Sequence, residues 1–208
     1  MTQNAIVQKE DYRRTYSKEE VNSLPLYRFE GEVILVASDF ALSQALMRMR
    51  REWVLGFDTE SRPNFQKGGI NSPALAQVAC SDVVFLIQLM RTGLTDDFIA
   101  LLEDPTILKA GVAIDDDMRH LCMIEPFAPG GIVDLGMAAR KKGMATQGLR
   151  TLTANFLKGR ISKGAQCSNW EQKKLSPQQI LYAATDAWVS REIFLHMNGM
   201  GFFSPGAM

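Results

Sequence analysis

The sequence predicts an α/β protein in which helices flank a central mixed β-sheet. Apolar runs typical of strands gather in the first half of the chain, whereas segments with helical spacing and helix caps dominate the second half. Two apolar runs, 74–80 and 83–87, are separated only by Ser81 and Asp82, which indicates a hairpin and therefore an antiparallel pair. At 208 residues, 46% of them hydrophobic, the chain is expected to form one domain with a sizeable core.

The elements are expected in a regular order along the chain. Residues 1–26 are polar and predict an N-terminal extension, in which Ser17 and Glu20 have the spacing of a capping box for a short helix. Strands are expected at 32–36, 53–60, 74–80, 83–87 and 107–112, with a short extended piece at 132–133. Helices are expected at 38–51, 95–102, 115–124, 134–142 and 149–157.

Apolar side chains on these helices are assigned to the core. In the helix at 38–51, the spacing predicts an apolar side made of Phe40, Leu42, Leu46 and Met47. Four further residues are expected to fill the core rather than to contact a substrate: Met118, Met123, Met137 and Trp170.

The last helix has the clearest start signal. Ser176 supplies a cap, Pro177 suits the first helical position and Gln179 completes a capping box, so a long helix is expected to run to about His196. The Gly-containing residues 199–208 predict a flexible C-terminal tail, which leaves 27–198 as the main domain.

Two acids on the strand at 53–60 are the strongest sign of chemistry. Asp58 and Glu60 are two residues apart, so their side chains point to the same face of a strand that begins with a buried apolar run. Their mutual repulsion and desolvation are relieved if a hard cation such as Mg²⁺ lies between them. The alternative is an exposed strand end with two solvated acids.

Two later segments carry further acids. Asp115, Asp116 and Asp117 follow the strand at 107–112, where they indicate either a site residue or a solvated helix N-terminus, which favours negative charge. Tyr182 and Asp186 lie four residues apart, so they share one face of the last helix. That pair alone also fits a buried tyrosine beside a surface acid.

Together, the order Asp-x-Glu, Asp and Tyr-x-x-x-Asp resembles the DEDDy group of 3′–5′ exonucleases. Over about residues 30–198 the chain is similar to the exonuclease domain of the Werner syndrome protein and to RNase D-like enzymes. The similarity is carried by the segments Gly56-Phe57-Asp58-Thr59-Glu60, Ala110 to Asp117, Cys167-Ser168-Asn169-Trp170 and Leu181 to Ala187.

The resemblance implies an RNase H-like fold and a set of catalytic residues. By this resemblance Asp58, Glu60, Asp117 and Asp186 hold two divalent metal ions, Mg²⁺ or Mn²⁺, and Tyr182 helps to place the attacking water. The choice of Asp117 over its two acidic neighbours rests on the resemblance. A phenol with a reference pKa near 10 is a poor base at neutral pH, so a positioning role is expected for Tyr182.

The implied function is a metal-dependent 3′–5′ exonuclease that releases nucleoside 5′-monophosphates from the 3′ end of DNA or RNA. Two alternatives stay open at this point. One is a non-catalytic nucleic-acid-binding module that keeps the site as a relic. The other is a phosphodiesterase for short oligonucleotides.

The charge distribution bears on the nucleic-acid partner. The formal net charge is zero, but residues 140–174 contain nine basic residues and one acid, Glu171. This basic segment precedes the third motif and suits a phosphodiester backbone, although it also fits the solvated faces of ordinary helices. Residues expected to contact the nucleic acid are Arg62, Phe65, Arg119 and Lys163.

The remaining features bear on the compartment. The three cysteines lie far apart without C-x-x-C spacing, which favours a reducing environment and argues against a structural zinc site. No basic-then-apolar signal and no apolar stretch of spanning length is visible. The sequence therefore predicts a cytoplasmic protein without membrane contact, and it identifies no protein partner.

Overall fold

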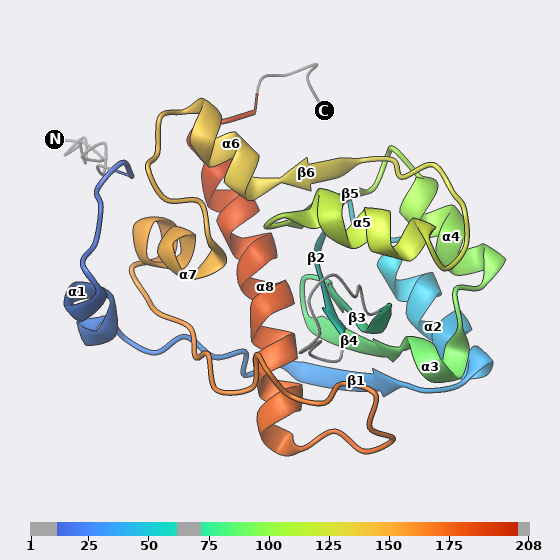
Figure 1. Ribbon diagram of the computed structural model, residues 1–208. Coiled ribbons are helices and arrows are strands. Elements are labelled where there is room, and N and C mark those ends of the chain that lie inside the picture. Colours follow the sequence, from blue (N-terminus) through green and yellow to red (C-terminus); the bar gives the residue numbers. More distant parts are fainter. Residues whose placement is uncertain (1–11, 62–71, 204–208) are drawn as a thin grey trace, which may run out of the picture.

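The computed structural model describes residues 12–61 and 72–203, which form a mixed sheet with helices on both faces (Figure 1). Within the described residues the strand order is β1-β4-β3-β2-β5-β6. The parallel pairs are β1 with β4, β2 with β5, and β5 with β6, whereas β3 is antiparallel to both of its neighbours. The strands are β1 (Glu32–Val36), β2 (Val54–Ser61), β3 (Pro73–Ala79), β4 (Val83–Gln88), β5 (Leu108–Gly111) and β6 (Ile132–Asp134). The predicted α/β class and the hairpin of β3 and β4 are confirmed.

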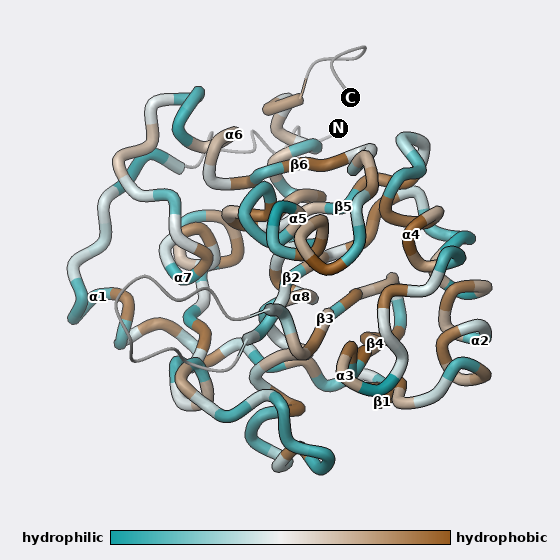
Figure 2. Tube along the Cα trace, turned by 45° about the vertical axis from the view of Figure 1, so that its right-hand side comes forward, coloured by the Kyte–Doolittle hydropathy of each residue, from teal (hydrophilic) through white to brown (hydrophobic). Residues whose placement is uncertain are grey.

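One face of the sheet is covered by α2 (Asp39–Met49), α4 (Asp96–Glu103) and α5 (Ile114–Cys122). Phe57 and Phe85 of the sheet pack there with apolar residues of all three helices. Figure 2 shows hydrophobic colours along β3 and β4 and on parts of α2 and α4. Because both faces of β3 and β4 are covered, every residue of these strands is buried.

The other face is crossed by the long helix α8 (Pro177–Gly199). It begins as predicted: the Gln179 backbone N–H donates to Ser176 Oγ at 3.2 Å, and the Ser176 N–H donates to Gln179 Oε1 at 2.9 Å. The helix continues to Gly199, three residues beyond the expected end. Trp170 packs beneath it and is 1% exposed, which confirms its assignment to the core.

Glycine at position 56 permits the close approach of α8 to β2. A Cβ atom at Gly56 would lie 2.0 Å from the carbonyl oxygen of Ala187, so even alanine would collide with the helix backbone. This contact brings the middle of α8 against the strand that carries Asp58 and Glu60.

Several predicted core residues face solvent instead. Phe40 is 76% exposed and Met47 is 49% exposed, so their assignment to the apolar side of α2 is wrong. The stripe that faces the sheet consists of Leu42, Ala45, Leu46 and Met49. This stripe has the i, i+3, i+4, i+7 spacing of one helix face, and the two exposed residues lie outside it. Met123 and Met137 are also exposed, whereas Met118 is buried as predicted.

The predicted helix at 149–157 changes its geometry halfway. It consists of a short α7 (Leu149–Leu152) followed by a buried π-helical turn, η1 (Thr153–Leu157). The other helices are the short α3 (Leu89–Thr92), which the sequence analysis did not predict, and α6 (Leu135–Lys141). A π-helical turn does not differ from an α-helix in apolar spacing strongly enough to be recognised from sequence.

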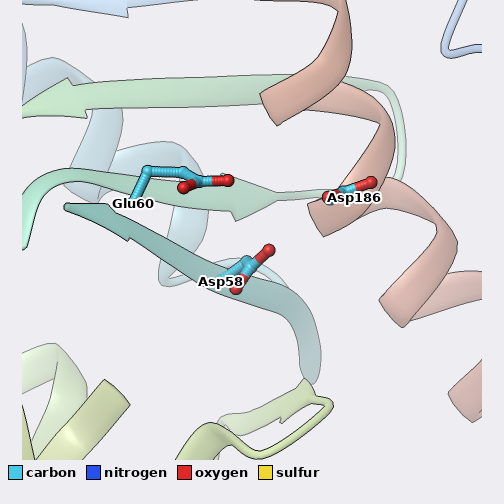
Figure 3. Close-up of side chains that lie close together, drawn as sticks. All are labelled: Asp58, Glu60 and Asp186. Atoms are coloured by element: carbon cyan, nitrogen blue, oxygen red, sulfur yellow. The ribbon is translucent and has the colours of Figure 1, made fainter. Parts of the chain in front are cut away.

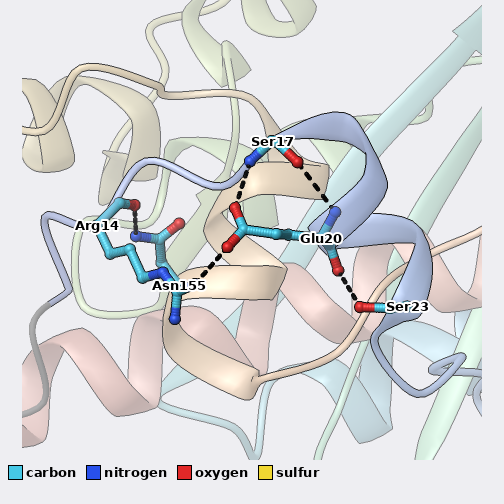
Figure 4. Close-up of polar contacts among 5 residues, drawn as sticks. All are labelled: Arg14, Ser17, Glu20, Ser23 and Asn155. Atoms are coloured by element: carbon cyan, nitrogen blue, oxygen red, sulfur yellow. Dashed lines mark hydrogen bonds and ion pairs between the residues drawn. The ribbon is translucent and has the colours of Figure 1, made fainter.

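The described part of the N-terminal extension packs against the domain. In α1 (Lys18–Ser23), Ser17 and Glu20 form the predicted capping box, and Figure 4 shows the Asn155 amide donating to the Arg14 carbonyl oxygen at 2.8 Å. Tyr12 contacts the rings of Phe156 and Phe202. The domain boundary at residue 27 stays a prediction, and residues 204–208 of the predicted tail lie outside the described residues.

Among the helices of the described residues, none has the length and apolar character needed to cross a membrane.

Candidate active site

The carboxyl-terminal half of β2 supplies the first two acids of the site. Asp58 and Glu60 project to the face of the sheet that α8 covers, and both are partly buried. Thr59, between them, points to the opposite face. The backbone N–H of Thr59 donates to Asp58 Oδ1 at 2.9 Å, which limits the orientation of that carboxyl group.

Helix α8 brings the third acid to these two. Carboxylate oxygens of Asp58, Glu60 and Asp186 all lie within 4.8 Å of one another. Figure 3 shows the carboxyl groups of Asp58 and Glu60 directed toward Asp186. Tyr182 lies one turn earlier on α8, and its hydroxyl donates a hydrogen bond to the Asp186 carboxyl. Residues separated by more than 120 positions in sequence therefore converge at one end of β2.

The acid from α5, Asp117, lies outside the group of three acids within 4.8 Å and is connected to it through Thr59. Asp117 Oδ1 accepts a hydrogen bond of 2.6 Å from the Thr59 hydroxyl. Asp116 points to solvent, where it forms an ion pair with Arg119, and Asp115 is also exposed. Of the three consecutive aspartates, Asp117 is the one that the structure brings beside Asp58 and Glu60.

Burial raises the pKa values of all four carboxyl groups, and repulsion from neighbouring carboxylates raises those of Asp58, Glu60 and Asp117 further. Burial is the main cause at Asp58, and the neighbouring charge of Asp186 adds to it. Burial together with Asp58, Asp186 and Asp117 raises the pKa of Glu60 to about 9. The pKa of Asp117 is raised by burial and by Asp58, and that of Asp186 by burial alone, against a lowering effect of the Tyr182 hydrogen bond.

The pKa of Tyr182 is raised by burial and by the adjacent Asp186, so its phenol keeps its proton at neutral pH. A protonated phenol can donate or accept a hydrogen bond but is not a strong base. The electrostatics therefore agree with a positioning role for Tyr182.

The donor set fits a divalent metal ion. Asp186 is 5% exposed, and its Oδ1 has no hydrogen-bond partner within the described residues. A buried acceptor without a partner is costly, and hard cations prefer carboxylate oxygens. Asp58, Glu60 and Asp186 would hold such an ion, and Asp117 adds negative charge beside them.

A pocket of about 300 Å³ opens beside Tyr182 and Asp186. One wall is the first half of α8, and a second is the loop that contains Ser162. The third wall is the segment Leu26–Arg28, which sequence reasoning did not connect with the site. This segment is held by a bridge between Leu26 and Arg160, with the Tyr27 N–H donating to the Arg160 carbonyl at 2.8 Å. The role of Leu26–Arg28 as a pocket wall follows only from its pairing in the tertiary structure, because this segment carries no sequence motif.

Two of the four residues predicted to contact nucleic acid can be located in the structure. Arg62 and Phe65 lie outside the described residues. Arg119 is exposed and engaged with Asp116, and Lys163 is exposed directly after Ser162, a residue of the pocket. Two arginines of the basic segment form hydrogen bonds within the protein: Arg150 donates to the Asn22 side chain, and Arg160 donates to the Leu24 carbonyl. These two arginines hold the N-terminal segment in place.

The fold and the site together define an α/β protein with a cluster of partly and fully buried acids that fits a divalent metal ion. The chain belongs to the 3′–5′ exonuclease family, because the family model described as 3′–5′ exonuclease matches residues 33–201. The resemblance found in the motifs is thereby confirmed.

Curated relatives agree with this membership. A 3′–5′ exonuclease of Arabidopsis thaliana is 27% identical over 207 residues, which cover 91% of this chain and 72% of the relative. The bifunctional 3′–5′ exonuclease/ATP-dependent helicase WRN of Mus musculus is 30% identical over 191 residues, which cover 86% of this chain. This chain spans only 14% of that much longer protein.

Solved structures share the fold. The EXO domain of Nibbler from Aedes aegypti superposes with a TM-score of 0.73 at 25% identity, covering 84% of this chain and 94% of that domain. RNase D of Escherichia coli has a TM-score of 0.73 at 20% identity and covers 85% of this chain and 48% of its own. An RNase D of Trypanosoma brucei, solved in complex with RNA U12, has a TM-score of 0.67 at 21% identity, covering 81% of this chain and 62% of its own. The predicted RNase H-like fold is confirmed.

Proposed function

We propose that this chain is a metal-dependent 3′–5′ exonuclease that hydrolyses DNA or RNA from the 3′ end. The observation that carries the proposal is the convergence of Asp58, Glu60 and Asp186 within 4.8 Å, with one buried oxygen of Asp186 lacking a hydrogen-bond partner among the described residues. Family membership supports the direction of cleavage.

The acids would hold two divalent ions, Mg²⁺ or Mn²⁺. When bound, such ions neutralise negative charge on the phosphodiester group and lower the pKa of a coordinated water. Asp58, Glu60 and Asp186 would supply the tighter site, and Asp117 would add a carboxylate on the side of α5.

Tyr182 orients the attacking water through its hydroxyl group, which stays protonated. The oxygen of that water forms a bond to phosphorus, and the bond between phosphorus and the 3′ oxygen of the preceding nucleotide breaks. The leaving oxygen takes up a proton, the attacking water loses one, and the product is a nucleoside 5′-monophosphate.

The pocket beside Tyr182 and Asp186 would receive part of the nucleic-acid strand near the scissile bond. Its volume of about 300 Å³ is at the small end of ligand pockets and suits one nucleotide rather than a duplex. Arg28 on its wall supplies positive charge for a phosphate. A pocket of this volume favours a single-stranded 3′ end. An RNase D with the same fold was solved with RNA, which supports a nucleic-acid substrate.

A gel assay on 5′-labelled single-stranded DNA and RNA tests the proposal, with Mg²⁺, Mn²⁺ or EDTA in parallel. We expect a metal-dependent ladder that shortens from the 3′ end, its loss in Asp58→Ala, and its retention in Asp116→Ala, which removes an exposed acid of α5. Closed circular single strands should resist.

Other outcomes assign the chain differently. Metal-independent binding without product release would indicate a binding module with a relic site. Activity that falls steeply as the substrate lengthens would indicate a phosphodiesterase for short oligonucleotides.

The cytoplasmic location stays a prediction, which fractionation of cells that express the protein would test.

A further inference from the structure

Gln77, at the centre of β3, is a buried polar side chain that the catalytic assignments leave unexplained. It is 0% exposed, and neither Nε2 nor Oε1 has a hydrogen-bond partner within the described residues. Every other residue of β3 is apolar, and all of them are buried. Burying an amide without partners is unfavourable, so an apolar residue would be expected at this position unless the amide has a use.

The strand register places Gln77 next to the acids. Gln77 lies directly opposite Asp58 in the antiparallel pair of β2 and β3. Directly opposed residues project to the same face, with Cβ atoms roughly 4.5–5.5 Å apart. The Gln77 and Asp58 side chains therefore start side by side on the face of the sheet that α8 covers.

Helix α8 covers this part of β3. Leu75 and Ala79, the neighbours of Gln77 on the same face, pack in one cluster with Ala183, Ala184 and Ala187 of α8. These small residues flank Asp186 in sequence and allow the helix to approach the sheet closely. Gln77 is thus enclosed between the strand that carries Asp58 and the helix segment that carries Asp186.

The chemistry of the two groups is complementary. An amide Nε2 offers two donors, and an ionised carboxylate accepts several hydrogen bonds. Asp58 receives one such bond from the Thr59 N–H at Oδ1, which leaves acceptor capacity on the carboxyl group. The terminal torsion of glutamine is broad, so the amide can turn toward the carboxylate at little cost.

We propose that Gln77 is a positioning residue of the metal site, whose side-chain amide donates to the ionised Asp58 carboxylate and orients it toward Glu60 and Asp186. Groups that hydrogen-bond a metal-binding carboxylate fix its orientation and support metal affinity. This inference rests on the proposed metal-dependent function of the same site.

The test compares Gln77→Met, which keeps the length of the side chain and removes the amide, with Leu86→Met. Leu86 lies opposite Gln77 on its other side and is equally buried, so it controls for changes in packing. Mn²⁺ affinity is measured by titration calorimetry on EDTA-stripped protein, and the melting temperature is measured in EDTA. Gln77→Leu serves as a second variant without the amide.

We expect Gln77→Met to lower Mn²⁺ affinity about 10- to 100-fold, as the loss of an outer-shell partner does, with no loss of melting temperature in EDTA. Leu86→Met should bind Mn²⁺ as the wild type does. The inference is overturned if Gln77→Met binds Mn²⁺ with unchanged affinity. It is also overturned if both Gln77 variants fail to fold in EDTA, because Gln77 would then be a purely structural residue. If the wild-type protein itself binds no Mn²⁺, the proposed function fails first.

Discussion

The Thr59 hydroxyl donates a 2.6 Å hydrogen bond to Asp117 Oδ1, and this contact joins β2 to the first turns of α5. Thr59 lies between Asp58 and Glu60, whose side chains occupy the opposite face of the strand. The end of β2 is therefore contacted by site residues from both layers of helices, α5 on one side and α8 on the other.

This contact predicts which aspartate of α5 acts in the site. Asp117→Asn should lower kcat by about 100-fold or more, the magnitude typical for loss of one preorganised charged or polar group that stabilises the transition state. Asp116→Asn should leave kcat near the wild-type value, because that side chain is exposed and pairs with Arg119. Steady-state kinetics on one oligonucleotide measure both variants. Equal losses in the two would contradict the assignment of Asp117.

The raised carboxyl pKa values predict the pH dependence of stability without metal. The folded-state pKa of Glu60 is about 9 against an ordinary value of 4.5, and those of Asp58, Asp117 and Asp186 are raised as well. Between about pH 4 and pH 9 the folded state therefore binds more protons than the unfolded state. The free energy of unfolding should fall as pH rises, by about 1.4 kcal/mol per pH unit for each extra proton bound.

Urea unfolding in EDTA at a series of pH values measures this slope. Asp58→Asn should make the slope shallower and raise the stability at pH 8, because it removes one ionisable group from the cluster. Saturating Mn²⁺ should restore stability to the wild-type protein at pH 8. A flat profile in EDTA between pH 5 and pH 8 would show that the four acids are not coupled as described.

Gly56→Ala should destabilise the protein, because the new Cβ would lie 2.0 Å from the Ala187 carbonyl oxygen. We expect a loss of about 1–3 kcal/mol or more from overpacking, together with weaker Mn²⁺ binding as α8 and Asp186 move away from β2. Gly199→Ala is the matched control, since nothing lies within 4 Å of a Cβ there. Thermal melts in EDTA and calorimetry with Mn²⁺ provide the two readouts. A Gly56→Ala protein as stable as the control would argue against the close helix contact.

Arg28→Gln should raise KM for oligonucleotides several-fold and leave Mn²⁺ affinity unchanged, because Arg28 lines the pocket without belonging to the acid cluster. The dependence of binding on salt should also weaken, as expected when one phosphate contact is lost. Arg51→Gln, which removes an exposed arginine just after α2, is the control. If both variants shift KM equally, Arg28 contributes only to the general charge of the protein.

Much of the site could be predicted from local spacing. Asp58 and Glu60 share a face because strand side chains alternate, and Tyr182 and Asp186 share one because a helix repeats every 3.6 residues. The start of α8 could be predicted for a similar reason, since the capping box involves residues only three apart. Relations of this kind depend on backbone geometry alone and do not require knowledge of the rest of the fold.

Other features depended on which segments meet in space. The exposure of Phe40 is decided by how α2 sits on the sheet, and the pocket wall at Leu26–Arg28 exists because that segment pairs with Arg160. The placement of Gln77 opposite Asp58 follows from the register of β2 and β3, which a single sequence does not encode locally. The sequence by itself determined the acids, their spacing and the α/β class. Only the tertiary structure decided which buried groups surround those acids, because packing between distant segments creates that environment.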